Sequence, residues 1–169
     1  MFESKHSRFE TLVRAYSAQL YRYAYWLCRD RFGAEDLVQE TFARAWSSLS
    51  GLREDHAAKN WLYTILRNEH ARLFERKRLP IDDEQDLDSL VDPKLGSAHE
   101  AFEMREALHA LPPSYREPLL LQVMGGFTCE EIAKMMDLSE GAVMTRLSRA
   151  RLALRNQAGL ADGHQEATV

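Results

Sequence analysis

Four arginines recur along the last predicted helix of the chain. Arg146, Arg149, Arg151 and Arg155 lie within 140–156, where no acidic residue follows Glu140. A guanidinium group donates parallel hydrogen bonds from a planar fork, which suits phosphate oxygens and the edge of guanine. The pattern therefore predicts a helix that binds nucleic acid, although a solvated basic face is the simpler alternative.

A second polar set, Asp36, Gln39 and Glu40, lies closer to the N-terminus. The spacing i, i+3, i+4 places the three side chains on one face of a helix. An acid–amide–acid face complements a basic partner helix, although in isolation such a face is more often simply solvated. On its spacing alone we therefore expect a solvated face, and a protein-binding role needs support from the flanking sequence.

No group of residues indicates catalysis or a metal site. Cys28 and Cys129 are far apart with no CxxC pair, and the histidines form no HxxxH or HExxH motif, so we expect free thiols that are at least partly buried. Glu130 and Glu131 are paired carboxylates, but neighbouring helical residues point about 100° apart. With no nucleophile–base pair or Gly-rich phosphate loop, we predict no enzyme activity, no cofactor, no metal and no small-molecule substrate.

The charge of the chain is unevenly distributed. Its 169 residues carry a formal net charge of −4, but residues 80–100 hold seven acids and one base, a net −6 that leaves +2 for the rest. An acidic total therefore does not exclude a nucleic-acid partner. No apolar run approaches the roughly 18 residues of a membrane span, and the N-terminus has no signal core, so we expect a cytoplasmic protein without direct membrane insertion.

Apolar residues at helical spacing predict three helices in the N-terminal half, at 7–29, 34–49 and 58–77. Gly33 is expected to form the connection between the first two helices. This would place Glu35 and Asp36 in the first helical turn of the second one, where acids suit the helix dipole. Trp46 is expected to point inward, and Trp61 to belong to the core rather than to stack on a base.

The C-terminal half predicts a helix-turn-helix. A helix begins near 98, Ser114 and Glu117 resemble a capping box for the next one, and Thr128 caps a short helix before a turn at 137–139. Apolar residues should lock the last helix onto the short one: Ile132, Ala133, Leu138, Val143 and Leu147. The predicted fold is all-α, with a three-helix bundle at 1–79, an acidic flexible linker at 80–97, a helix-turn-helix domain at 98–157 and a disordered tail at 158–169.

These motifs resemble the extracytoplasmic-function (ECF) group of the sigma-70 family of bacterial transcription-initiation factors. Asp36–Trp46 (DLVQETFARAW) resembles the polymerase-binding helix of sigma domain 2, and residues 52–68 are similar to the element that opens and reads the −10 promoter DNA. Residues 98–155 resemble sigma domain 4, which reads the −35 element. The large extra domains of housekeeping sigma factors are missing, which is typical of the ECF group.

The resemblance implies roles for individual residues. Asp36, Gln39 and Glu40 would contact the clamp helices of the largest subunit of core RNA polymerase, whose flap is a further expected contact. The −10 DNA would be bound by Arg53, His56, Lys59, Asn60, Arg67, Asn68 and Arg72, and the −35 DNA by Thr128, Cys129, Met144, Thr145, Arg146, Ser148 and Arg149. Met144 stands where Lys or Arg is common, and Cys129 replaces a frequent aromatic residue. An anti-sigma factor that covers both DNA-facing surfaces is a further implied partner.

The main alternative is a conventional helix-turn-helix regulator whose N-terminal bundle senses a ligand or a phosphorylation. Such a protein would bind DNA without polymerase and would need a dimerisation surface or a sensing pocket. An anti-sigma or scaffold protein built from the same helices would not need the arginine-rich last helix.

Overall fold

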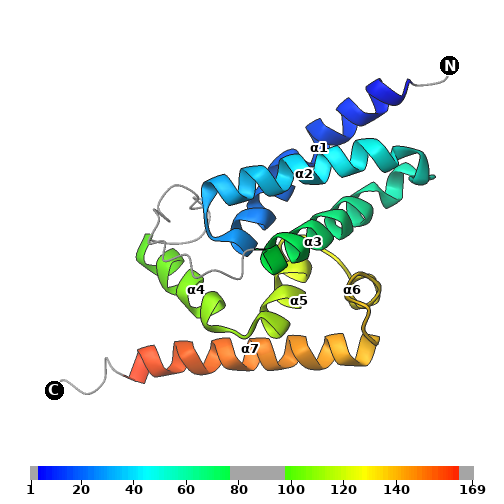
Figure 1. Ribbon diagram of the computed structural model, residues 1–169. Coiled ribbons are helices and arrows are strands. Elements are labelled where there is room, and N and C mark those ends of the chain that lie inside the picture. The colour runs from blue at the N-terminus through cyan, green and yellow to red at the C-terminus, as the bar shows by residue number, and fades with distance from the viewer. Residues whose placement is uncertain (1–3, 77–97, 164–169) are drawn as a thin grey trace. The chain divides into compact units, whose positions relative to one another are not determined.

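The computed structural model describes residues 4–76 and 98–163, and the chain divides into two compact units, Met1–Leu87 and Asp88–Val169 (Figure 1). Within the described residues every regular element is a helix, as the sequence predicts. None of these helices is both long and apolar enough to span a bilayer. The predicted linker at 80–97 lies wholly outside the described residues, and so do residues 164–169 of the predicted tail.

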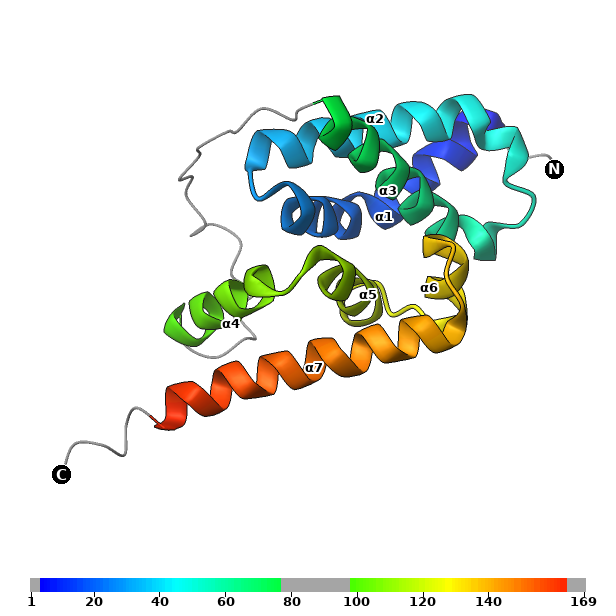
Figure 2. The ribbon, with the colours of Figure 1, turned by 60° about the horizontal axis from the view of Figure 1, so that its bottom comes forward.

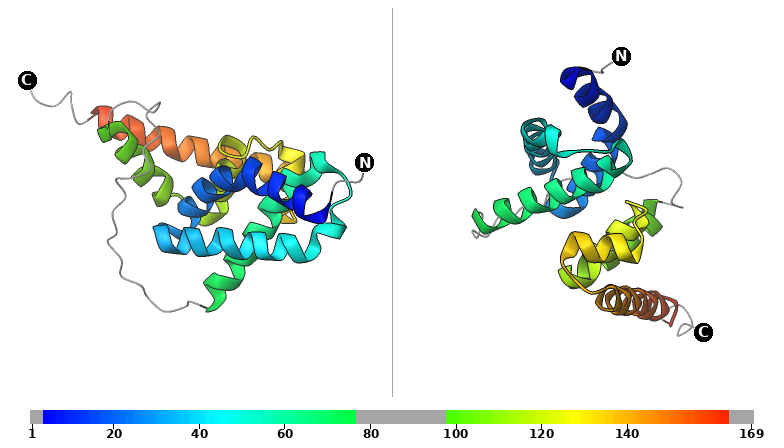
Figure 3. Two further views of the ribbon diagram at one scale, coloured as in Figure 1. Left: turned by 90° about the horizontal axis from the view of Figure 1, so that it is seen from above. Right: turned by 90° about the vertical axis from the view of Figure 1, so that its right-hand side faces the viewer.

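The first unit is a bundle of three helices, α1 (Lys5–Cys28), α2 (Arg31–Ser48) and α3 (Ala58–Arg76), which pack on one another (Figure 3). Two single-turn 3₁₀ helices, Leu49–Gly51 and Asp55–Ala57, connect α2 to α3. The centre of the bundle is formed by Leu20, Tyr23, Leu37, Leu62, Tyr63 and Leu66, each at most 1% exposed. Full burial of one such apolar side chain contributes about 1.5–3 kcal/mol. Burial also raises the pKa of the Tyr63 phenol, against the lowering effect of Arg22.

Two predictions for α2 are wrong. The turn before it is made by Arg29, in the left-handed region at φ 60°, and Asp30, whose carboxylate accepts hydrogen bonds from the backbone N–H groups of Phe32 and Gly33. Gly33 therefore lies inside the first turn of α2, and Glu35 and Asp36 both lie beyond it, because the Asp30 cap moves the start of the helix to Arg31. Trp46 is 38% exposed rather than internal.

The second unit contains α4 (Ala98–Ala110), α5 (Pro113–Val123), α6 (Cys129–Met136) and α7 (Glu140–Gly163), with α7 packed against α5 and α6 (Figure 2). The predicted lock between the last two helices is confirmed for Ile132, Ala133, Val143 and Leu147, which are buried, while Leu138 is half-buried. Helix α7 continues past residue 156, so residues 158–163, expected to belong to a disordered tail, are helical.

The start of α5 also differs from the prediction. Pro112 occupies the N-cap position without a side-chain hydrogen bond, and Pro113 is the first helical residue. Proline suits this position because its fixed φ matches the helix and its missing N–H would have no helical partner there. Ser114 is therefore already inside the helix and makes no capping box with Glu117. Pro118 lies within the helix and is buried.

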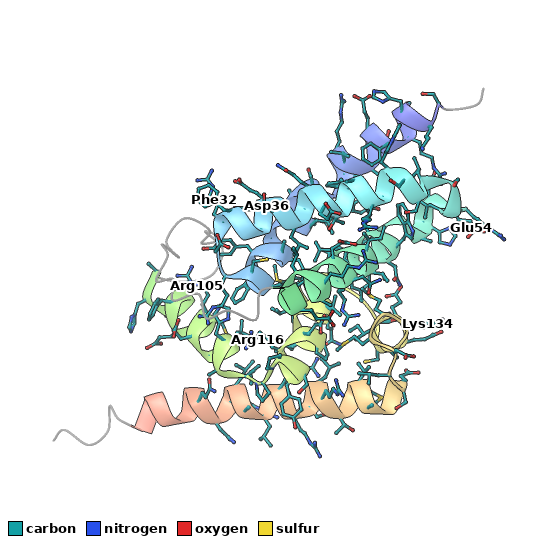
Figure 4. All side chains as sticks on the ribbon, in the orientation of Figure 1. Phe32, Asp36, Glu54, Arg105, Arg116 and Lys134 are labelled. Carbon is teal, nitrogen blue, oxygen red and sulfur yellow. The ribbon has the colours of Figure 1, made fainter. Side chains whose placement is uncertain are left out.

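Arg116 joins α4 to α5 through three hydrogen bonds. Its guanidinium group donates to the backbone carbonyls of Leu108 at 3.0 Å, His109 at 2.8 Å and Leu111 at 2.8 Å. The last carbonyls of a helix lack helical partners and carry partial negative charge, so an arginine at this end satisfies them and interacts favourably with the helix dipole. Figure 4 shows Arg116 on α5, directed toward α4.

Thr128 caps α6, as predicted, and the structure shows a full capping box there. Its hydroxyl accepts from the Glu131 N–H at 3.2 Å, and the Glu131 carboxylate accepts from the Thr128 N–H at 2.8 Å, which makes a complete capping box. Before it, Gly125 has no room for a side chain, since an added Cβ would lie 2.5 Å from the Phe127 ring and 2.6 Å from the Leu121 carbonyl oxygen. Cap and close turn together fix where the helix-turn-helix begins.

Thr128→Ala is expected to destabilise α6 by about 1 kcal/mol, because the Glu131 N–H of the first turn loses the hydroxyl oxygen that accepts it. Hydrogen exchange of the α6 amides should then be roughly fivefold faster than in the parent protein. Thr145→Ala is the matched control: its hydroxyl bonds only to the Gly141 carbonyl within α7. Equal exchange in the Thr128 variant and the parent would contradict the capping role.

Candidate functional site

The acid–amide–acid set on α2 forms one exposed face, as its spacing predicts. Asp36, Gln39 and Glu40 are all exposed, while Leu37, Thr41 and Ala45 on the opposite side of α2 are buried. The core packing therefore holds the helix with this face outward. Asp36 and Gln39 form no hydrogen bond or ion pair with another described residue, so both side chains remain available to a partner.

A hollow between α2 and α3 adjoins this face and is lined by Asp36, Glu40, Arg44, Glu69, Arg72 and Leu73. Glu69 is only 6% exposed, and its carboxylate lies 3.3 Å from Arg44 and 3.4 Å from Arg72. Arg44 also contacts Glu40 at 3.3 Å. A buried carboxylate requires such cationic partners, so this network holds Arg44 and, through it, Glu40.

The loop between α2 and α3 is attached to α1 by Arg8. The Arg8 guanidinium donates to the Asp55 carboxylate at 3.0 and 2.9 Å and to the Leu52 carbonyl at 2.8 Å. Leu52 and Ala58, at the two ends of the loop, pack with Leu12 and Leu49 in a cluster that Phe9, Tyr16, Ala57 and Trp61 extend. Trp61 thus belongs to the core side, as predicted. Polar and apolar contacts both fix where this loop lies.

Arg8→Ala should loosen residues 52–57 without unfolding the bundle. The lost hydrogen bonds involve charged groups, but Asp55 is 74% exposed, so we expect a loss of about 1 kcal/mol. Amide exchange of the loop should accelerate by roughly fivefold, and exchange in the middle of α3 should not change. Arg14→Ala, an exposed arginine on α1, is the control; equal effects from the two variants would remove the special role of Arg8.

The predicted −10 residues are divided between the loop and one side of α3. Asn60, Arg67 and Asn68 are spaced 7 and 8 residues apart, which puts them on the side away from Leu62 and Leu66. Asn68 is exposed, and the Asn60 side-chain oxygen accepts from Thr64 at 3.3 Å. Arg53 and His56 are exposed on the loop, where His56 lies 3.0 Å from Glu54, and Lys59 is half-buried at the start of α3.

Arg72, one helical turn after Asn68, also contacts a residue outside this group. Its contact with Glu69 places it in the hollow beside Asp36 and Glu40, on the side of α3 that faces α2. Part of its charge is therefore balanced by a buried carboxylate within the protein. The structure thus brings Arg72 together with the residues of the α2 face, one helical turn from Asn68.

The helix-turn-helix is completed by a tight turn between α6 and α7. Asp137 adopts the left-handed conformation at φ 53°, and its N–H and that of Leu138 donate to the Ala133 carbonyl. The Ser139 hydroxyl then accepts from the Ala142 N–H at 3.1 Å, in the manner of an N-cap. These contacts set the direction of α7 relative to α6.

The predicted base-facing residues lie together on the outer side of α7. Met144, Thr145, Ser148 and Arg149 are exposed, whereas Val143, Leu147 and Ala150 on the other side are buried. Arg146, also predicted to bind DNA, is half-buried. The side chain of Met144 is 56% exposed, so this surface carries an apolar group where a cation was expected from the resemblance.

Two arginines of α7 also contact α5. Arg149 donates to the Tyr115 hydroxyl at 3.3 Å, and Arg151 donates to the Gln122 side-chain oxygen. Each guanidinium has five N–H groups, so one internal bond leaves others for an external acceptor. On α6, the Glu130 carboxylate raises the pKa of the Lys134 ammonium, which donates to it at 2.9 Å.

Both cysteines are free and half-buried, as predicted. Among the described residues, no three His, Cys, Asp or Glu side chains gather in a way that could hold a metal ion. Thr128 is exposed and Cys129 half-buried at the start of α6, which is where the resemblance predicts phosphate contacts. This first turn also contains Glu130 and Glu131, so its charge is not uniformly favourable to phosphate.

Sequence reasoning missed four residues that shape these surfaces. Glu69 was given no role, although its spacing to Arg72 is that of an i, i+3 pair. Arg8 and Arg116 act on backbone carbonyls, which no sequence pattern marks. Phe32 was given no role, yet it is 70% exposed at the start of α2.

Comparisons with known proteins follow the division into two units. Residues 12–79 match the family model "Sigma-70 region 2", and residues 101–154 match "Sigma-70, region 4". An ECF RNA polymerase sigma factor, SigM of Bacillus subtilis, is 30% identical over 152 residues that cover 86% of this chain and 92% of SigM. The probable RNA polymerase sigma factor RfaY of Xanthomonas campestris is 34% identical over 78% of this chain, which spans only 35% of RfaY.

The fold has solved counterparts. The sigma factor RpoE of Bartonella quintana, in complex with the anti-sigma factor NepR, superposes with a TM-score of 0.72 at 26% identity, covering 90% of this chain and 97% of the other. The residues matched by the two family models include α2 with its exposed polar face, the loop that leads to α3, α3 itself, and the helix-turn-helix.

Proposed function

Because the chain belongs to the sigma-70 family, in its ECF group, we propose that it is a transcription-initiation factor that binds core RNA polymerase and directs it to promoters. The observation that carries the proposal is the α2 face, on which Asp36, Gln39 and Glu40 are exposed together opposite a buried side. A helix-turn-helix alone is common to many DNA-binding proteins, whereas this face followed by the tethered loop and α3 is typical of sigma domain 2.

Docking on polymerase would use the α2 face. Its two carboxylates and one amide complement the basic surface expected on the clamp helices of the largest polymerase subunit. The Glu69 network supports this role, because it restrains Arg44 beside Glu40. Since Arg72 belongs to the same network, we propose that it supports polymerase docking more than it binds −10 phosphates.

Reading of the −10 element would use the loop and the outer side of α3. An unstacked base is recognised through hydrogen bonds to its exposed edge, and the amide of Asn68 offers both a donor and an acceptor. Arg53 and His56 on the loop, with Lys59, Asn60 and Arg67 on α3, supply the surrounding polar and cationic groups. Arg8 would keep the loop in position while the base is captured.

Reading of the −35 element would use α7 in the major groove. Its outer side presents Thr145, Ser148 and Arg149, which can donate to base edges or phosphates, and Met144, which can make only apolar contacts. Thr128 and Cys129 would lie near the DNA backbone. Arg146 is half-buried, so only its guanidinium group would reach the backbone. The −35 sequence should therefore include a position read by apolar contact, such as a thymine methyl.

The protein would act without chemistry of its own. Strand opening would draw on captured unstacked bases without nucleotide hydrolysis, so we propose a factor rather than an enzyme. Its work would take place in the cytoplasm, where polymerase and DNA meet. The complex of the similar RpoE with NepR supports an anti-sigma factor as a further partner, one that would cover the surfaces that bind polymerase and DNA.

Promoter binding in the presence and absence of core polymerase tests the proposal. We expect the purified chain to bind a fork-junction DNA with a single-stranded −10 element only when core polymerase is present. Tight, sequence-specific binding of the chain alone to duplex DNA, unchanged by polymerase, would favour the conventional regulator instead.

A further inference from the structure

Phe32 is exposed in a way that the fold of the first unit does not require. Its side chain is 70% exposed at the start of α2, although most large apolar residues of this unit are at least half-buried. A single exposed apolar residue is common in proteins and needs no explanation by itself. Its neighbours on the helix are what make this one informative.

The backbone at Phe32 is held by a helix cap. The Asp30 carboxylate accepts from the Phe32 N–H at 3.0 Å and from the Gly33 N–H at 3.0 Å, so the first turn of α2 is capped. Arg31 and Glu35 form an i, i+4 ion pair at 3.2 Å beside it. An aromatic side chain on a fixed backbone loses little conformational freedom when it becomes buried in an interface.

Phe32 lies on the same face of α2 as the proposed polymerase-binding residues. Positions 32, 36, 39 and 40 follow the i, i+4, i+7, i+8 pattern that aligns side chains along a helix. Figure 4 shows Phe32 and Asp36 at the same end of α2, both directed away from the bundle. The face therefore carries an aromatic side chain directly followed by its polar set.

We propose that Phe32 is the apolar anchor of the polymerase-binding surface, and that it inserts between the side chains of the partner helices next to the cations that meet Asp36 and Glu40. The proposal rests on the function proposed above and extends its surface by one turn toward the N-terminus of α2. Interface energy commonly concentrates in one or a few aromatic or arginine side chains surrounded by polar contacts. The arrangement on α2 has this composition.

The charges around Phe32 favour this partner over two others. DNA phosphates would be repelled by Asp36 and Glu40, which share the face with Phe32. A second copy of the chain, paired face to face through α2, would bring the same carboxylates close to their own counterparts. A basic helical partner with an apolar groove would bury the Phe32 ring and pair its cations with the two carboxylates.

Phe32→Ala tests the proposal in binding of the full chain to core polymerase, measured by surface plasmon resonance. We expect the dissociation constant to rise roughly tenfold, mainly through faster dissociation, with an unchanged dependence on salt. Phe32→Leu should restore most of the affinity. Asp36→Asn, in contrast, should change the association rate and reduce the salt dependence, because it removes a long-range attraction.

Phe102→Ala is the matched control, since Phe102 is 49% exposed on α4, in the other unit. Circular dichroism should show the same helix content in all variants. Wild-type affinity of Phe32→Ala, or an equal loss in Phe102→Ala, would overturn the anchor. So would a wild-type dimer, seen by sedimentation, that Phe32→Ala dissociates. If the wild-type chain fails to bind core polymerase at all, the proposed function itself falls, a result distinct from each of these.

Discussion

Replacing Asp36 with arginine should weaken binding to core polymerase by about 100-fold or more, because a desolvated charge contact is converted into a repulsive one. Asp36 is the cleanest probe of the α2 face, since it is exposed and forms no ion pair with another described residue. The helix and the bundle core should therefore be unaffected. Equilibrium binding of the full chain to core polymerase at two salt concentrations is the measurement.

Glu10→Arg is the control for this prediction, because Glu10 is an exposed acid on α1 of the same unit and gives the same change in net charge. Its effect should be small at physiological salt, where exposed charges are largely screened beyond about 8 Å. If Glu10→Arg and Asp36→Arg lower the affinity for core polymerase equally, the effect comes from the net charge of the protein, and the α2 face is not a docking site.

Asn68→Ala and Arg149→Ala should damage two different steps of promoter use. Loss of the Asn68 amide should slow strand opening and relax the −10 preference, with −35 binding intact. Loss of the Arg149 guanidinium should weaken −35 binding, with a loss of about 1–3 kcal/mol, or roughly 5- to 150-fold in affinity. Fluorescence of 2-aminopurine in the −10 element reports opening, and competition with −35 duplexes reports affinity.

Each of these variants has a matched control in the chain. Tyr115→Phe removes the hydroxyl that accepts from Arg149 and leaves the guanidinium in place, so it separates DNA binding from packing of α7 on α5. Asn156→Ala removes an exposed amide on α7 that has no assigned role. If Asn68→Ala and Arg149→Ala lower promoter affinity equally and independently of the DNA sequence, the assignment of Asn68 to the −10 element and of Arg149 to the −35 element is contradicted.

The helices and their inward faces could be predicted because burial imposes a period that a sequence displays. The apolar spacing over 34–49 predicted a helix with one inward side, and burial of Leu37 and Thr41 on that side leaves Asp36 exposed on the other. Thr128 identified the start of α6 because an N-cap residue is a local signal, and the structure adds Glu131 as the second half of a capping box. Local periodicity and local hydrogen bonding are both visible in a sequence.

The errors and omissions have equally physical causes. Gly33 suggests a turn, but the carboxylate of Asp30 accepts its N–H and keeps it helical. Trp46 fits the apolar stripe of α2, yet it lies at the rim of the bundle. There its ring centre is 5.1 Å from that of Phe9 and 4.3 Å from the Lys5 ammonium nitrogen. Arg8 bonds to Asp55 across 47 residues, a pairing that depends on tertiary structure and leaves no local pattern.

Run-off transcription with purified core polymerase tests the central claim most directly. With this chain added, we expect transcripts that start at defined promoters, disappear when either the −35 or the −10 element is scrambled, and are lost with Asp36→Arg but retained with Glu10→Arg. No promoter-dependent transcript from an active core polymerase, together with specific binding of the chain alone to duplex DNA, would contradict the claim and make the protein a conventional regulator.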